Sequence, residues 1–206
     1  MSWRPRPRNS AWGTDWMSSH FTVVYDACVL YPAPLRDLLM HLALSDVYRA
    51  RWSDLIHDEW TRNLHASRPD LSPDQLARTR QLMNAHVRDS LVCGFEHLIP
   101  AIELPDLDDR HVVAAAIHSG AETIVTFNLK DFPSGALDRY NLDAQHPDDF
   151  IVDLFDLHPA SVLQALAEQR ASLKRPPKTA DEFLDILLKQ GLTQTVSILK
   201  DWKTAF

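Results

Sequence analysis

The stretch from Leu104 to Phe132 constrains the fold of this chain more than any other part of its sequence. It begins with an acidic loop, continues with an apolar helical run from Val112 to Ile117, and breaks at Gly120. A short β-branched segment from Thr123 to Phe127 follows, which is the pattern of a buried strand. This order predicts an αβ unit that brings a helix N-terminus and a strand C-terminus to the same side of a parallel sheet, the side where binding sites form.

The composition limits the class of protein. The 206 residues suffice for one sizeable core domain and a small appendage, and no apolar run is long enough to cross a bilayer. The net charge of −7 argues against a protein that coats nucleic acid through bulk electrostatics. It does not exclude a nuclease whose carboxylates take their counter-charge from a metal ion. Cys28 and Cys93 form no CxxC motif, and their apolar neighbours predict two buried free thiols in a reducing cytoplasm.

Further strands and capped helices are expected before the central unit. Phe21 to Val24 is a β-branched and aromatic run that ends just before Asp26, and Tyr48 to Trp52 has the pattern of a second strand. Ser53 is placed to cap the helix that follows this strand, and Ser72 begins another helix with a capping box. Helices that alternate with short buried strands predict an α/β architecture with a mainly parallel sheet.

Downstream of the central unit, the sequence predicts one edge strand at Tyr140 to Leu142 and otherwise helices. The segment from His158 onward has no strand pattern and no cluster of chemically active residues, so we expect helices that pack on the core or on a partner. The predicted organisation is therefore a flexible tail at residues 1–20, an α/β domain at 21–157 and a helical extension at 158–206.

Three acidic side chains fall where a strand ends or a helix begins, and a fourth lies within a helix. Asp26 follows the first strand, and Glu59 lies at the edge of the apolar stripe of a helix. Asp109 opens the central helix, and Asp131 follows the central strand. A carboxylate among the apolar neighbours of Asp26 is costly without a partner, so we favour a metal ligand there over a capping residue. Glu59 fits an ordinary helix-surface carboxylate equally well, and both interpretations stay open.

Weaker predictions concern five polar neighbours of these acids. One aspartate could replace Asp109, two residues could orient water or bond to Asp26, and two cations could contact RNA phosphates, although solvated charges fit the cations equally well. Hard oxygen ligands around one point select Mg²⁺ or Mn²⁺, which can activate water against a phosphodiester. No HExxH motif occurs, which argues against a zinc hydrolase. Of the five neighbours, Asp108 is the aspartate that could replace Asp109, and Asn128 and Thr126 are the residues that could orient water or bond to Asp26. The two cations are Arg110 and Lys130.

Four segments together resemble the acidic motifs of PIN domains, and more narrowly those of the VapC-type toxin ribonucleases of type II toxin–antitoxin modules. The segments read FTVVYDACVLY, IHDEW, LPDLDDRHVVAAAI and IVTFNLKDF. The resemblance covers about Phe21 to Phe155 and implies a three-layer PIN-like sandwich around a mainly parallel sheet. The helical tail resembles the C-terminal extension of some of these toxins. Each motif alone is weak, and their order and spacing carry the resemblance.

The resemblance implies that Asp26, Glu59 and Asp109 are catalytic metal ligands, and the fourth family position departs from the pattern. Asn128 stands where many relatives carry an aspartate, with Asp131 three residues further on. The lost negative charge places a second metal ion in doubt. We expect one Mg²⁺ or Mn²⁺ ion held through Asp26 and Asp109, with Glu59 and Asp131 acting partly through water.

The resemblance also implies a function and partners. It implies a cytoplasmic, Mg²⁺- or Mn²⁺-dependent endoribonuclease that cuts cellular RNA and is held inactive by a cognate antitoxin, and it leaves a homodimer open. One alternative is an RNA-processing or structure-specific PIN nuclease outside a toxin–antitoxin module. Another is a non-catalytic PIN-like binding module, which Asn128 keeps open. The arginines of the N-terminal tail leave an RNA-contacting arm as the alternative to a merely flexible segment.

Overall fold

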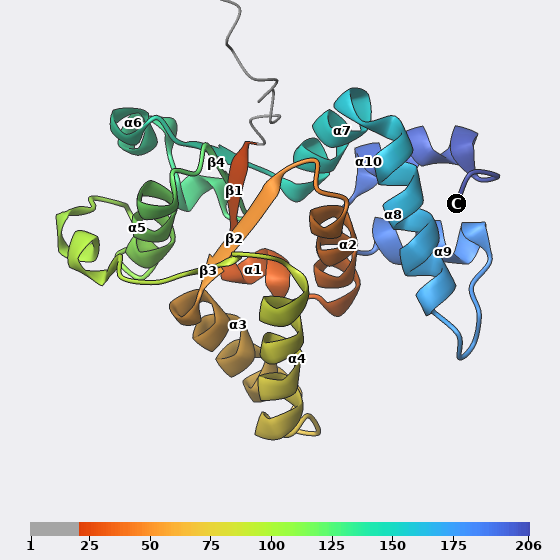
Figure 1. The fold of residues 1–206 in the computed structure, drawn as a ribbon, viewed down its shortest axis with the longest axis horizontal. Coiled ribbons are helices and arrows are strands. Elements are labelled where there is room, and N and C mark those ends of the chain that lie inside the picture. The colour runs from red at the N-terminus through yellow and green to blue at the C-terminus, as the bar shows by residue number, and fades with distance from the viewer. Residues whose placement is uncertain (1–20) are drawn as a thin grey trace, which may run out of the picture.

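The computed structural model describes residues 21–206, and the tail expected at residues 1–20 lies outside the described part. Five short strands form one sheet in the order β3-β2-β1-β4-β5, and every strand pair in it is parallel (Figure 1). The α/β sandwich predicted from the sequence is therefore confirmed. The strands are β1 Thr22–Tyr25, β2 Arg49–Ser53, β3 Leu91–Val92, β4 Thr123–Val125 and β5 Asp143–Gln145.

Helices connect the strands and cover the sheet, and a group of C-terminal helices extends the molecule on the side away from α5 (Figure 1). Residues 21–206 also contain four short 3₁₀ segments. The helices are α1 Ala27–Leu30, α2 Ala33–Leu44, α3 Asp54–Ser67, α4 Pro73–His86, α5 Arg110–Ser119, α6 Ser134–Leu137, α7 Pro147–Leu157, α8 Pro159–Ser172, α9 Ala180–Leu188 and α10 Thr193–Leu199, and the 3₁₀ segments are η1 Glu96–Ala101, η2 Leu129–Asp131, η3 Asp138–Tyr140 and η4 Lys200–Trp202.

The central strand β1 is buried on both faces, as its unbroken apolar run requires in a parallel sheet. Helix α5 packs on one face, with five consecutive buried residues from Val112 to Ala116. On the opposite face the hydroxyl groups of Tyr25 and Tyr48 both donate to the carbonyl of Leu39 in α2, at 3.3 and 3.4 Å. These contacts place β1 in the middle layer of the sandwich.

The strand order places a topological switch between β1 and β4. The chain runs from β1 outward to β2 and β3 and then returns to the other side of β1 as β4. Ligand sites of open parallel sheets form outside the carboxyl ends of the strands at such a switch. The residues that follow Tyr25 and Val125 therefore lie at the favoured position for a site.

The predicted helix caps are present. The Ser53 hydroxyl accepts the backbone N–H of Ile56 at 3.2 Å and so begins α3. Ser72 and Gln75 form both halves of a capping box at α4. Gly120 ends α5 in the left-handed conformation, with φ 64°, which a glycine adopts without the strain of a Cβ atom.

Two expectations from the sequence are wrong. The edge strand does not span Tyr140 to Leu142, because that stretch contains the end of η3 and a left-handed Asn141 with φ 53°. The strand β5 begins only after this turn. Cys93 is exposed rather than buried, because it lies beyond the end of the two-residue strand β3, whereas Cys28 is half-buried. Both cysteines are free, as predicted.

The C-terminal helices pack on the α/β core, and their buried apolar residues belong to the same continuous hydrophobic cluster. A buried carboxylate also holds α10 in place. Asp148 in α7 accepts the backbone N–H groups of Gln194 and Thr195 at 2.8 and 2.9 Å, and the Thr195 hydroxyl at 2.7 Å. The division at residue 158 stays a prediction. No helix within residues 21–206 is long and apolar enough to span a membrane.

Candidate active site

Asp26 lies directly after β1, at the switch point of the sheet, and is only 2% exposed. Its backbone is extended, at φ −71° and ψ 155°, and its side chain does not cap the short helix α1 that follows. Within the described residues the Asp26 side chain makes no cap bond, so the interpretation of Asp26 as a capping residue is wrong. The side chain instead bonds to residues beyond the end of the neighbouring strand β4.

Two side chains donate to the same carboxylate oxygen of Asp26. The Thr126 hydroxyl donates to Oδ2 at 2.7 Å, and the Cys28 thiol donates to Oδ2 at 2.9 Å. Burial and the adjacent Asp26 carboxylate both raise the pKa of the Cys28 thiol, so the sulfur keeps the proton that it donates. Of the alternatives that the sequence left open for Thr126, the bond to Asp26 is the one present, whereas the sequence predicted only a buried thiol at Cys28.

Asp109 occupies the N-cap position of α5 but makes no side-chain cap bond there. It is 9% exposed, and its Oδ2 atom is buried without a hydrogen-bond partner in the described part of the chain. Burial, followed by the negative charge of Asp26, raises the pKa of Asp109 to about 7. A buried oxygen without a donor is unusual in a folded protein and indicates a place that a ligand can satisfy.

Glu59 faces the same region from α3 and is half-buried. Burial, followed by the charge of Asp26, raises its pKa to about 7, while the guanidinium of Arg62 partly opposes this rise. His111 lies 3.5 Å away through its Nε2 atom, and its Nδ1–H donates to the carbonyl of Asp108 at 2.7 Å. Because burial lowers the pKa of His111, this imidazole supplies no positive charge that could balance Glu59 at neutral pH.

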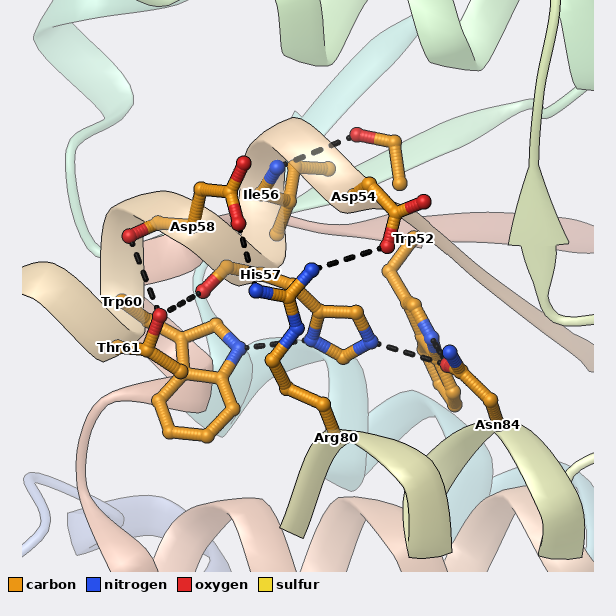
Figure 2. A network of polar contacts seen from close by, with 10 residues as sticks. Trp52, Asp54, Ile56, His57, Asp58, Trp60, Thr61, Arg80 and Asn84 are labelled. Atoms are coloured by element: carbon orange, nitrogen blue, oxygen red, sulfur yellow. Dashed lines mark hydrogen bonds and ion pairs between the residues drawn. The ribbon is translucent and has the colours of Figure 1, made fainter. Parts of the chain in front are cut away.

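A polar network fixes the opposite side of the helix that carries Glu59 (Figure 2). His57 is fully buried; its Nδ1 accepts the indole N–H of Trp60, and its Nε2–H donates to Oδ1 of Asn84 at 3.0 Å. The same oxygen of Asn84 accepts the indole N–H of Trp52 at 2.7 Å. These bonds join α3 to α4 and to the end of β2, so they set the rotation of α3 about its axis.

Two ion pairs reinforce the same packing of α3 on α4. Arg80 of α4 contacts Asp58 at 2.6 Å and Asp54 at 3.0 Å, both on α3 (Figure 2). The aromatic ring of Trp52 also stacks on Tyr25, the residue directly before Asp26, with ring centroids 6.1 Å apart. The helix of Glu59 and the strand of Asp26 are thus tied to one buried cluster.

The predicted residues beyond β4 divide into two groups. Asp131 is half-buried, and its charge contributes to the raised pKa of Asp109, so it belongs to the acidic region. The Asn128 side chain is exposed, and it is the backbone N–H of this residue that donates to the Thr126 hydroxyl at 2.9 Å. Asn128 therefore supports Asp26 through Thr126.

The remaining predicted residues lie at the rim of the acidic region. Asp108 is exposed, and its backbone N–H donates to Asp106 while its carbonyl accepts from His111. Lys130 is exposed on η2. Arg110 is half-buried at the start of α5, and its Nε atom lacks a hydrogen-bond partner among residues 21–206.

The arrangement brings Asp26, Glu59 and Asp109 within electrostatic range of one another, from three different elements. Within the described residues, no three His, Cys, Asp or Glu side chains gather closely enough to form a complete metal cluster. The donor set nevertheless fits a hard divalent cation, because it consists of carboxylate oxygens, one of them buried without a partner. Mutually repelling carboxylates of this kind require a counter-charge to remain ionised together.

Sequence reasoning missed the contacts that orient the acids. Cys28 lies two residues after Asp26, and a polar side chain at that spacing from an acid that ends a strand was a usable signal. The buried network around His57 had no comparable signal, because its four members come from three separate elements. Only the folded chain brings them together.

An all-parallel sheet with acidic side chains at its switch point defines an α/β protein with a candidate ligand site at the carboxyl ends of its strands. Residues 22–130, just over half of the chain, match the PIN domain family. The chain therefore belongs to the PIN-domain family. Residues 147–201 match the VapC50 C-terminal domain, so the predicted resemblance to VapC-type toxins is confirmed.

A curated relative is similar to part of the chain. It is the "Putative ribonuclease VapC50" of Mycobacterium tuberculosis, which is 41% identical over 97 residues. The aligned region covers 47% of this chain and 57% of that protein, so the chain spans a little over half the length of this relative. No solved structure matches the chain.

Proposed function

We propose that this protein is the toxin of a type II toxin–antitoxin module and cleaves RNA internally by divalent-metal-dependent hydrolysis of phosphodiester bonds. The observation that carries the proposal is the buried Oδ2 atom of Asp109, which has no hydrogen-bond partner within residues 21–206 and lies within electrostatic range of Asp26 and Glu59. Membership of the VapC-type PIN proteins and the similarity to a protein named as a ribonuclease support the same function.

Asp26 and Asp109 are the proposed ligands of one Mg²⁺ or Mn²⁺ ion. When bound, such an ion would supply positive charge and the Lewis acidity that activates water toward a phosphodiester. Asp26 is suited to this role because Thr126 and Cys28 hold one of its oxygens in place. Asp109 is suited because its Oδ2 has no competing donor in the described part of the chain.

Glu59 and Asp131 are proposed to act partly through water at the edge of this site. Glu59 comes from a helix whose rotation is fixed by the His57 network, so its carboxylate has a defined position. Asp131 and Asp108 add negative charge nearby, while Arg110 and Lys130 lie where they could contact RNA phosphates. These cations would offset the repulsion between an acidic site and the RNA backbone.

The proposed protein partner is a cognate antitoxin, which would keep the toxin inactive while it is bound. The proposed compartment is the cytoplasm. The VapC-type membership supports this proposal. A homodimer is a further proposal of the same kind. Mass measurements of the protein alone and together with the product of an adjacent small gene test both proposals.

RNA cleavage by the purified protein tests the proposed function. We expect cleavage of a mixed cellular RNA in Mg²⁺ or Mn²⁺, loss of cleavage in EDTA, and loss in Asp26→Asn and Asp109→Asn with the fold retained. The exposed Asp156 of α7 offers a matched control, because Asp156→Asn removes an equal charge away from the acidic region. Cleavage that survives Asp26→Asn would reject the enzymatic function.

One observation keeps a non-catalytic binding module as the second candidate. Among residues 21–206 no complete cluster of metal-binding side chains is present, and Asn128 stands at the fourth acidic position. Binding of RNA without any cleavage in either metal would favour this candidate. Cleavage without an adjacent antitoxin gene would instead favour an RNA-processing nuclease.

A further inference from the structure

The carboxylate of Asp26 is held asymmetrically. Its Oδ2 atom accepts two side-chain hydrogen bonds, from Thr126 at 2.7 Å and from Cys28 at 2.9 Å. No side-chain or backbone donor within residues 21–206 reaches its Oδ1 atom. One oxygen is therefore occupied by the protein, while the other remains available at the switch point of the sheet.

The two donors are themselves fixed by the backbone that follows β4. The Cys28 sulfur accepts the backbone N–H of Phe127 at 3.2 Å, and the Thr126 hydroxyl accepts the backbone N–H of Asn128 at 2.9 Å. The sulfur and the hydroxyl also lie 3.4 Å apart. Each donor thus connects Asp26 to a different peptide group, which restricts rotation of the carboxylate more than one bond would.

A second carboxylate oxygen without a hydrogen-bond partner belongs to a residue whose charge interacts with that of Asp26. The Oδ2 atom of Asp109 is buried and has no hydrogen-bond partner in the described chain, and Asp26 is the charged group that acts most strongly on Asp109. The two carboxylates are therefore close enough for their charges to interact, and no hydrogen-bond donor is shared between them within residues 21–206.

We propose that Cys28 is a positioning residue that, together with Thr126, fixes Oδ2 of Asp26 and so directs Oδ1 toward the divalent cation. The inference rests on the proposed function, because it names how one proposed ligand is oriented. Cys28 acts through Asp26 and does not itself touch the cation or the RNA. Hydrogen-bonding partners of ligands typically change metal affinity by about 10- to 100-fold when they are removed.

Manganese affinity of three single variants tests this role. Cys28→Ala removes the donor, and we expect Mn²⁺ to bind about 10-fold more weakly, with a lower kcat and an unchanged KM for RNA. Cys28→Ser keeps a donor and an acceptor at the same position, so we expect it to restore the affinity to within about threefold of the original protein. Cys93→Ala is the matched control, because Cys93 is the exposed free thiol and lies outside these contacts.

The affinity is measured by titration calorimetry and by the electron paramagnetic resonance signal of free Mn²⁺, so the readout does not depend on RNA cleavage. If Cys28→Ala does not fold, Cys28→Val replaces it as a variant of similar size without a donor. Unchanged Mn²⁺ affinity in the donor-free variant, with Mn²⁺ bound by the original protein, would overturn the role of Cys28 and leave the proposed function standing. If the original protein itself binds no Mn²⁺, the proposed metal-dependent function fails first.

Discussion

Removing the charge of Asp109 is expected to stabilise the metal-free protein at neutral and higher pH. Burial and the nearby carboxylates raise the pKa of Asp109 from its ordinary 3.8 to about 7. In the unfolded chain no such environment exists, so the folded state binds more protons than the unfolded state between about pH 4 and pH 7. The free energy of unfolding therefore falls as the pH rises through this window.

The size of the effect follows from the same values. Each pKa unit corresponds to about 1.4 kcal/mol. The increase of the pKa of Asp109 from 3.8 to about 7 therefore means that folding disfavours the charged carboxylate by about 4 kcal/mol. Solvent screening of these carboxylates reduces this cost, and we expect a measurable difference in the free energy of unfolding of about 1 to 2 kcal/mol. The Asp109→Asn side chain cannot ionise, and it loses no cap bond because Asp109 makes none.

Urea unfolding in EDTA at pH 5 and pH 8 measures this difference. We expect Asp109→Asn to be more stable than the original protein by about 1 to 2 kcal/mol at pH 8, or roughly 2 to 8 °C in Tm for a chain of this size, and the gain to shrink at pH 5. Asp156→Asn, on the exposed side of α7, is the control and should show no such gain. An Asp109→Asn protein that is no more stable at pH 8 would refute the claim that burial and the neighbouring carboxylates make the charged form of Asp109 costly.

Three further predictions concern stability and RNA binding. His57→Ala should cost about 2 to 4 kcal/mol in urea unfolding, because it leaves the Trp60 indole N–H unpaired in a new cavity, whereas the exposed Asn63→Ala should change little. Burial lowers the pKa of His57, so the unfolded chain protonates this imidazole more readily than the folded chain does. The contribution of His57 to the free energy of unfolding should therefore be lost as the pH falls below about 6.5. Asp148→Ala should cost about 2 to 4 kcal/mol by leaving the N–H groups of Gln194 and Thr195 without an acceptor, and an equal loss in Asp156→Ala would contradict this. Lys130→Ala, measured by fluorescence anisotropy with RNA in the Asp26→Asn background, should weaken binding and lower the salt dependence by about one phosphate contact, whereas the exposed Lys189→Ala should do neither.

The parts of the fold that could be predicted from the sequence are those set by local patterns. The apolar run at β1, the serine caps of α3 and α4, and the glycine that ends α5 each act within a few residues, and the structure contains all of them. The edge strand was misplaced because Asn141 adopts a left-handed conformation, which a short polar side chain tolerates but does not require.

The positions of the acids were predictable, whereas the groups that orient them were not. The chain order of strands and helices, which the sequence records, places Asp26 directly after β1 and Asp109 directly before α5. The bond from Cys28 to Asp26 depends on the rotamers of two side chains, and the His57 network depends on how α3 packs on α4. Such contacts are set by tertiary packing, which local spacing does not encode.

Binding of Mn²⁺ to the intact protein tests the central claim most directly, because the claim is that Asp26 and Asp109 hold a divalent cation. We expect saturable binding of one ion per chain, loss of this binding in both Asp26→Asn and Asp109→Asn, and unchanged binding in Asp156→Asn. Absence of saturable binding in the original protein, or binding that both substitutions leave intact, would contradict it.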